Sequence, residues 1–153
     1  MTELRFSGKI SGSLNVPPDK QGKKGFDDYT IRVDLVESGK RTLNWWEKKV
    51  SPDSIKTLFA LAPSHKGIGK IHFPNVGTDA KQIGKARTHP LSDLMEETVV
   101  TVADANGRFS FTNRFARPMS VLAAWNSSDG DDTKSNFAVP LDELEIRSGE
   151  PKK

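Results

Sequence analysis

The chain reads Tyr-Thr-Ile-Arg-Val-Asp-Leu over residues 29–35, so apolar and polar side chains alternate along it. Because successive side chains of a strand point to opposite faces, this period predicts a half-buried strand. Its core-facing side would carry Tyr29, Ile31, Val33 and Leu35. Turn-forming residues follow at 37–40, and they predict a hairpin that returns as a strand through residues 41–50.

Two further segments support this sheet. Residues 4–10 show the same alternation, and their core-facing side would carry Leu4, Phe6 and Ile10. In the expected strand at 41–50, alternation places Trp45 in the core and Trp46 on the outside. These segments together predict three strands at the start of the chain.

A helix is expected over residues 51–62. Ser51 and Pro52 form a typical helix start, with a capping hydroxyl and a proline at the first helical position. The apolar residues that follow at helical spacing, and that would face the sheet, are Ile55, Leu58 and Phe59.

The remaining chain is read as short strands and loops. A strand is expected at 71–73, closed by Pro74, and the polar residues 75–89 indicate irregular structure. Residues 90–97 favour one or two helical turns. Asn106-Gly107 lies between two β-rich runs and predicts a C-terminal β-hairpin around 98–113. A further strand is expected at 119–125.

The order of three strands, a helix and further strands resembles the OB fold, a small Greek-key barrel that often binds oligonucleotides. The resemblance is architectural and covers about residues 4–73 best. We therefore expect a mainly β protein, an OB-like barrel or a sandwich. Residues 1–147 would form a single β-rich domain, followed by a flexible C-terminal tail at 148–153.

Composition narrows the class of protein. The chain has no cysteine, which fits a reducing compartment, and it has no apolar run long enough to span a membrane. Its start lacks the apolar stretch of a signal peptide, so a cytoplasmic location is expected. Residues 1–87 hold 16 Lys or Arg and 9 Asp or Glu, a balance of +7 that suggests an anionic partner.

The sequence carries no recognised signature of an enzyme or of a cofactor site. The glycines and lysine at 67–70 lack the spacing of a phosphate-binding loop, and the histidines lack the spacing of metal ligands. Asp129, Asp131 and Asp132 resemble an acidic calcium loop, but the expected spacing of carboxylates is missing. We expect a protein without enzymatic activity, metal or cofactor.

Cations and one aromatic ring gather on the outward side of the first three expected strands. Phosphates require positive charge along a path, and unpaired bases stack on aromatic rings. The sequence therefore predicts non-enzymatic binding of single-stranded DNA or RNA through this face, the following loop and a second cluster near residue 115. The candidate residues are Arg5, Lys9, Lys20, Lys23, Lys24, Arg32, Trp46, Lys48, Arg114, Phe115 and Arg117.

An alternative remains open on the same residues. An outward tryptophan with apolar neighbours can equally bury against another protein or a second copy of the chain. A structural or assembly protein, including a homo-oligomer, is therefore the second interpretation.

Overall fold

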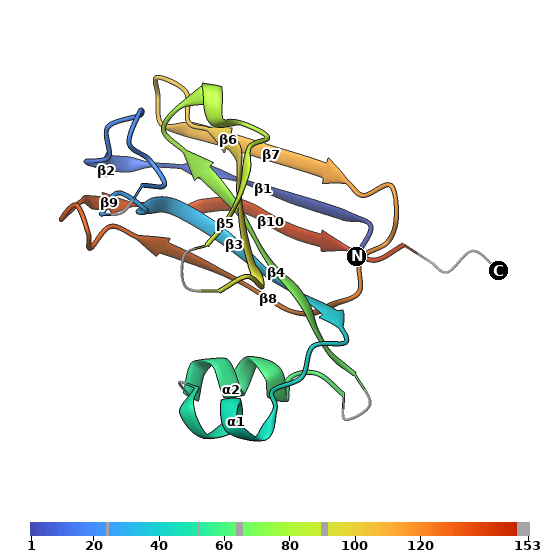
Figure 1. Ribbon diagram of the computed structural model, residues 1–153. Coiled ribbons are helices and arrows are strands. Elements are labelled where there is room, and N and C mark those ends of the chain that lie inside the picture. The colour runs from blue at the N-terminus through green and yellow to red at the C-terminus, as the bar shows by residue number, and fades with distance from the viewer. Residues whose placement is uncertain (24, 52, 64–65, 90–91, 150–153) are drawn as a thin grey trace.

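The computed structural model describes residues 1–23, 25–51, 53–63, 66–89 and 92–149 (Figure 1). Two β-sheets form the body, and a pair of short helices lies below them in the view of Figure 1. The three-stranded sheet has the order β10-β1-β7, and the five-stranded sheet has the order β5-β6-β4-β3-β8. The mainly β class predicted from the sequence is thus confirmed.

The strands and helices follow one another in an order that interleaves the two sheets. Their bounds are β1 Glu3–Lys9, β2 Ser11–Ser13, β3 Tyr29–Gly39, α1 Trp45–Val50, α2 Asp53–Ala60, β4 Gly67–Gly77, the 3-10 helix η1 Ala80–Gln82, β5 Ala86–Thr88, β6 Met95–Val102, β7 Arg108–Arg114, β8 Val121–Asp129, β9 Asn136–Ala138 and β10 Leu141–Arg147. Strands β2 and β9 form a separate two-stranded ribbon. In the described chain β5 and β8 remain the edges of the five-stranded sheet, so it does not close into a barrel.

The main core lies between the two large sheets. The alternating stretch 29–35 supplies Ile31, Val33 and Leu35, and these pack against Leu4 and Phe6 of β1. The predicted core faces of β1 and β3 are therefore confirmed for these residues. The apolar side chains bury against one another from facing sheets, as they do in a sandwich.

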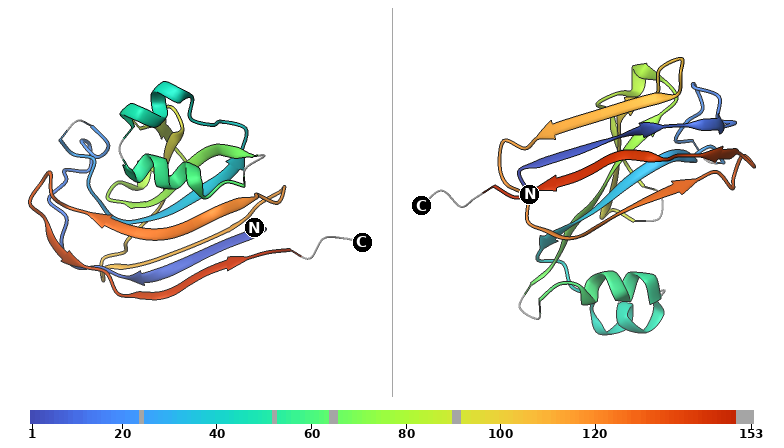
Figure 2. Two further views of the ribbon diagram at one scale, coloured as in Figure 1. Left: turned by 90° about the horizontal axis from the view of Figure 1, so that it is seen from below. Right: turned by 180° about the vertical axis from the view of Figure 1, so that it is seen from behind.

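The opposite face of the five-stranded sheet carries a second core. The three-stranded sheet and the two helices lie on opposite sides of the five-stranded sheet (Figure 2). Leu58 and Phe59 of α2 pack against a buried cluster that contains Val36, Ile68, Ile71 and Phe73. The expected helix after residue 51 is confirmed as α2, as is the direction of these two side chains. The side chain of Ile55 lies outside the described residues.

The expected return strand at 41–50 is wrong, because residues 45–50 form helix α1. Asn44 caps it: its Oδ1 accepts a hydrogen bond from the Glu47 amide at 2.9 Å, and its own amide donates to Glu47 Oε2 at 2.8 Å. This reciprocal pair is a capping box, which an Asn followed three residues later by Glu can form. The cap fixes a helix where alternation indicated a strand.

Strand β4 corrects a second expectation. Pro74 does not close the strand, which runs on to Gly77 and pairs in parallel with β6. The residues expected to be irregular include η1 and β5, and β6 begins at Met95, inside the segment for which helical turns were expected. Residues 90–91 of that segment lie outside the described chain.

The Asn106-Gly107 turn reverses the chain but does not make the expected hairpin. Strand β6 pairs with β4 and β5, whereas β7 pairs with β1 in the other sheet. Asp104 Oδ1 accepts hydrogen bonds from the amides of Asn106 at 2.8 Å and Arg108 at 2.9 Å, which tightens the turn. The turn therefore carries the chain from one layer to the other.

Matched leucine truncations test this division into two cores. Leu35→Ala removes a side chain buried between the sheets and should lower the free energy of unfolding by about 2–5 kcal/mol. Leu58→Ala should cost less, because that side chain is only partly buried. Urea denaturation of both variants provides the comparison, and a loss at Leu58 as large as that at Leu35 would contradict this description of α2.

Candidate functional site

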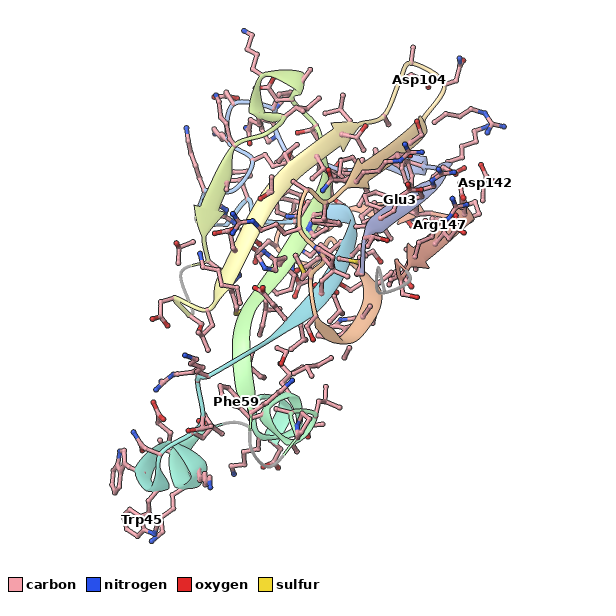
Figure 3. All side chains as sticks on the ribbon, turned by 90° about the vertical axis from the view of Figure 1, so that its right-hand side faces the viewer. Glu3, Trp45, Phe59, Asp104, Asp142 and Arg147 are labelled. Atoms are coloured by element: carbon pink, nitrogen blue, oxygen red, sulfur yellow. The ribbon has the colours of Figure 1, made fainter. Side chains whose placement is uncertain are left out.

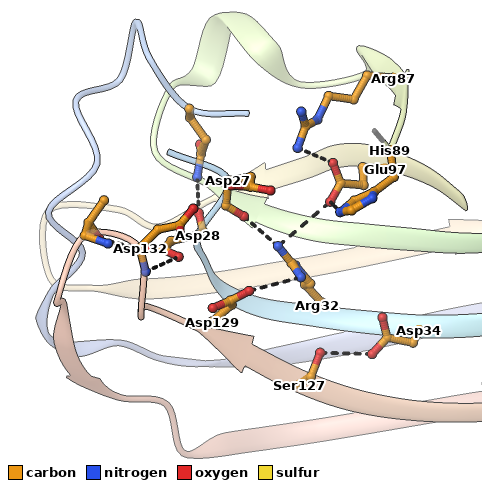
Figure 4. Close-up of polar contacts among 12 residues, drawn as sticks. Asp27, Asp28, Arg32, Asp34, Arg87, His89, Glu97, Ser127, Asp129 and Asp132 are labelled. Atoms are coloured by element: carbon orange, nitrogen blue, oxygen red, sulfur yellow. Dashed lines mark hydrogen bonds and ion pairs between the residues drawn. The ribbon is translucent and has the colours of Figure 1, made fainter. Parts of the chain in front are cut away.

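Arg32 is not on an open basic surface. Its side chain is 15% exposed and lies among acidic groups, with Nη1 3.4 Å from Asp129 Oδ2 and Nη2 3.8 Å from Glu97 Oε1 (Figure 4). Nη2 also donates a hydrogen bond to the Asp27 carbonyl oxygen at 2.5 Å. The guanidinium stands 5.1 Å from the ring centre of Tyr29. Its side chain is therefore paired within the fold and does not lie on the open basic face that the sequence predicted.

Glu97 is the carboxylate at the centre of this cluster. It is 2% exposed and forms a second ion pair with Arg87 of β5, while His89 Nε2 lies 4.0 Å from its Oε1 (Figure 4). A carboxylate this deeply buried requires paired cations, since desolvation of an unpaired charge costs several kcal/mol. Arg32 and Arg87 together hold β3, β6 and β5 in register.

Asp34 lies on the same side of β3 and accepts a hydrogen bond from Ser127 Oγ at 3.0 Å (Figure 4). Burial raises the pKa of its carboxyl group from 3.8 to about 6, against the opposing effects of Ser127 and of the Arg32 charge. The proton is therefore held more tightly in the folded protein than in the unfolded chain.

A cluster of carboxylates lies at the end of β8. Oxygens of Asp28, Asp129 and Asp131 lie within 4.8 Å of one another, and such ligands suit a hard cation. Asp28 was not among the sequence candidates for calcium. Its Oδ2 accepts hydrogen bonds from the Thr133 amide at 2.9 Å and from Thr133 Oγ1 at 2.5 Å, and these bonds account for its burial without an ion.

The other predicted binding residues are spread over separate parts of the fold. Arg5 and Arg114 come together, but both pair with Glu3 on the three-stranded sheet. Lys9 ends β1, and Lys20 lies over the Phe26 ring in the loop before β3. The structure does not gather the remaining candidates with Arg32 into one face; they are Lys23 in the same loop, and Phe115 and Arg117 between β7 and β8. Lys24 lies outside the described residues.

Trp46 and Lys48 are brought together in a different place. Residues 40–66, which we call the helical arm, connect β3 to β4 and contain α1 and α2. Trp45 and Trp46 are 68% and 63% exposed, and their ring centres lie 6.3 Å apart. Trp45 points away from the sheets at the far end of the arm, whereas Phe59 lies on the side of the sheets (Figure 3).

The helical arm that carries this pair of rings is positively charged. The helical arm holds six Lys or Arg and two Asp or Glu, a net charge of +4, whereas the whole chain carries +3. Lys49 Nζ stands 4.0 Å from the ring centre of Trp45, and Glu47 pairs with Arg41. A hollow of about 370 Å³ beside the helices is lined by Lys48, Lys56 and Lys66 together with apolar side chains.

The arm leaves the sheet through a narrow neck. Gly39 of β3 and Gly67 of β4 are partners in the ladder. A Cβ atom on Gly67 would lie 2.0 Å from the Arg41 carbonyl oxygen, so only glycine fits there. Sequence reasoning missed Trp45, which it assigned to the core. The capping residues Asn44 and Glu47 were the signal that could have placed both tryptophans on a helix.

Charge-reversing substitutions should affect stability differently at the buried Arg32 and at the exposed Lys48. Arg32→Glu leaves Glu97 without one of its cations and adds a like charge, so it should cost at least about 3–5 kcal/mol of stability. Lys48→Glu changes an exposed side chain and should leave the melting temperature close to that of the parent. Thermal unfolding followed by circular dichroism measures both, and a stable Arg32→Glu protein would refute the buried ion cluster.

The raised pKa of Asp34 predicts a pH dependence of stability. The pKa of Asp34 in the folded protein, about 6, exceeds the ordinary 3.8. The contribution of this group to the stability of the fold is therefore fully present below pH 3.8 and is lost as pH rises through 6. Asp34→Asn should therefore be more stable than the parent above pH 6, by up to about 3 kcal/mol, and the gain should shrink towards pH 4. The urea denaturation midpoints of the parent and of Asp34→Asn, measured at pH 4 and above pH 6, test this prediction. A gain in stability that does not change with pH would count against the raised pKa of Asp34.

Comparison with protein-family models, with curated protein sequences and with solved structures finds no match for this chain. Among the described residues, no helix is long and apolar enough to cross a membrane. What the chain binds is therefore inferred from its own surface.

Proposed function

We propose that this protein binds single-stranded DNA or RNA through the helical arm. Trp45 and Trp46 stack on unpaired bases, and the lysines of the arm neutralise the adjoining phosphates. The observation that carries this proposal is the pair of tryptophans, 68% and 63% exposed, beside Lys48 and Lys49 on a short helix. The binding face is thus moved from the sheet, where the sequence predicted it, to the arm.

Stacking accounts for the exposed rings. Each base that stacks on an aromatic side chain gains about 1–3 kcal/mol, and the gain depends little on which base it is. Two rings on adjacent residues could hold neighbouring or splayed bases of one strand. Duplex DNA offers no free base faces, so we expect a preference for single strands and weak sequence selectivity.

The positive charge of the helical arm would attract a nucleic acid and orient it on the protein. Outside the arm the chain holds 17 Lys or Arg and 18 Asp or Glu, a balance of −1, so the positive excess of the protein lies in the arm. A polyanion is attracted to the charged end of such a molecule. The hollow lined by Lys48, Lys56 and Lys66 gives phosphates a further place on the arm.

Docking of another protein is the second candidate. Val50 and Leu61 are also exposed on the helical arm, and Val50 follows Trp46 by one turn of α1. An apolar group of this kind can bury against a protein surface. Such a partner would depend on the rings and on Val50 and Leu61, whereas a nucleic acid would depend on the rings and on the lysines.

Salt-titrated binding to a fluorescein-labelled oligonucleotide tests the proposal. Affinity should fall as salt rises, with a slope of about −0.7 for each phosphate contact. Trp46→Ala should weaken binding by about 1–3 kcal/mol and leave that slope nearly unchanged. The double variant Lys48→Glu, Lys49→Glu should instead flatten the slope.

The control reverses two exposed lysines at the far end of the molecule. Lys81 and Lys85 lie at or next to η1, at the opposite end of Figure 1 from the arm. Lys81→Glu with Lys85→Glu changes the net charge by the same amount and should reduce affinity much less. The absence of oligonucleotide binding at low salt, or equal losses of affinity in the two double variants, would falsify the proposal. Loss of binding to a protein partner in Val50→Ser would favour the second candidate.

A further inference from the structure

Strand β8 is an edge strand that neither shortness, proline nor a run of charges protects. It ends the five-stranded sheet and pairs, in the described chain, with β3 alone. An edge exposes a row of backbone N–H and C=O groups that can pair with another strand. β8 is nine residues long, contains no proline and carries a single charged residue, Asp129, at its end.

The other edges of the described sheets are protected by length or by charge. β2, β5 and β9 have three residues each. β10 carries four charges, and β7 begins and ends with arginine. Short edge strands and charged side chains are the common means of preventing edge-to-edge pairing. β8 is therefore the long edge that remains open to a partner strand.

The flanks of β8 carry opposite charges. Arg117 precedes the strand, while Asp131 and Asp132 follow it, with a single lysine, Lys134, two residues further on. A second β8 in antiparallel orientation would place the basic flank of each copy beside the acidic flank of the other. A parallel partner would bring like charges together. The charge pattern thus fits a second copy of this chain in one orientation.

We propose that two copies of this protein associate through antiparallel pairing of β8 with β8, which joins their five-stranded sheets into one continuous sheet. Full overlap of the two strands places Trp125 opposite Trp125 of the second copy, because Trp125 is the middle residue of β8. Trp125 is 38% exposed, and its ring gains a partner at the interface. In this register Ala124 of each copy faces Asn126 of the other.

The surface formed by β8 is separate from the helical arm, so this inference does not rest on nucleic-acid binding.

Sedimentation velocity of the full chain, without oligonucleotide, tests the pairing. The parent should show a concentration-dependent shift from 16.9 kDa towards twice that mass. The double variant Ala124→Lys, Asn126→Lys places like charges opposite each other in both symmetric pairs, and it should remain monomeric. Circular dichroism checks that it is folded.

A matched variant tests the register. Ala124→Lys with Asn126→Asp makes the same number of changes at the same positions, but it places each new lysine opposite an aspartate of the second copy. It should dimerise at least as well as the parent. A monomeric parent at all concentrations, or two double variants with the same mass, would overturn the proposal.

Discussion

Strand β3 must bury both of its faces, and the rest of the structure follows from that constraint. One face packs Ile31, Val33 and Leu35 against the three-stranded sheet. The other carries Arg32 and Asp34 into the interior of the molecule, where each needs a partner. Glu97, Arg87 and Asp129 supply charge to Arg32 and its neighbours, and Ser127 supplies a hydrogen bond to Asp34. Arg32 and Arg87 are consequently committed to the fold.

The pairing of these arginines within the fold determines which charged groups remain on the surface. Arg5 and Arg32, which the sequence placed on one basic face, lie in different sheets and are ion-paired there. Lys48, Lys49 and both tryptophans of the helical arm are exposed. The arm leaves β3 and β4 at paired glycines and is anchored by Leu58 and Phe59. The buried cores and the proposed binding surface thus lie in different segments, so substitutions at the tip of the arm should leave the sheets intact.

The sequence predicted the parts of the fold that depend on local patterning. Alternation placed the core residues of β1 and β3, and helix-start residues placed α2. Alternation could not tell whether the polar face of β3 meets water or buried charges, because Glu97 and Arg87 are far away along the chain. It also predicted a strand at residues 45–50, because alternation takes no account of the capping pair Asn44 and Glu47 that starts a helix there. The Asn106-Gly107 turn predicted a reversal, but pairing is set by the neighbouring strands, which lie in different sheets.

The three tryptophans provide a direct test of where a nucleic acid binds. Each indole N–H gives its own signal in a ¹H–¹⁵N correlation spectrum, so Trp45 and Trp46 on the arm can be followed separately from Trp125 on β8. Titration with a single-stranded oligonucleotide is expected to shift the signals of Trp45 and Trp46 and to leave that of Trp125 in place. Shifts confined to Trp125, or no shift at any of the three indoles at low salt, would contradict the central claim that the helical arm is the binding surface.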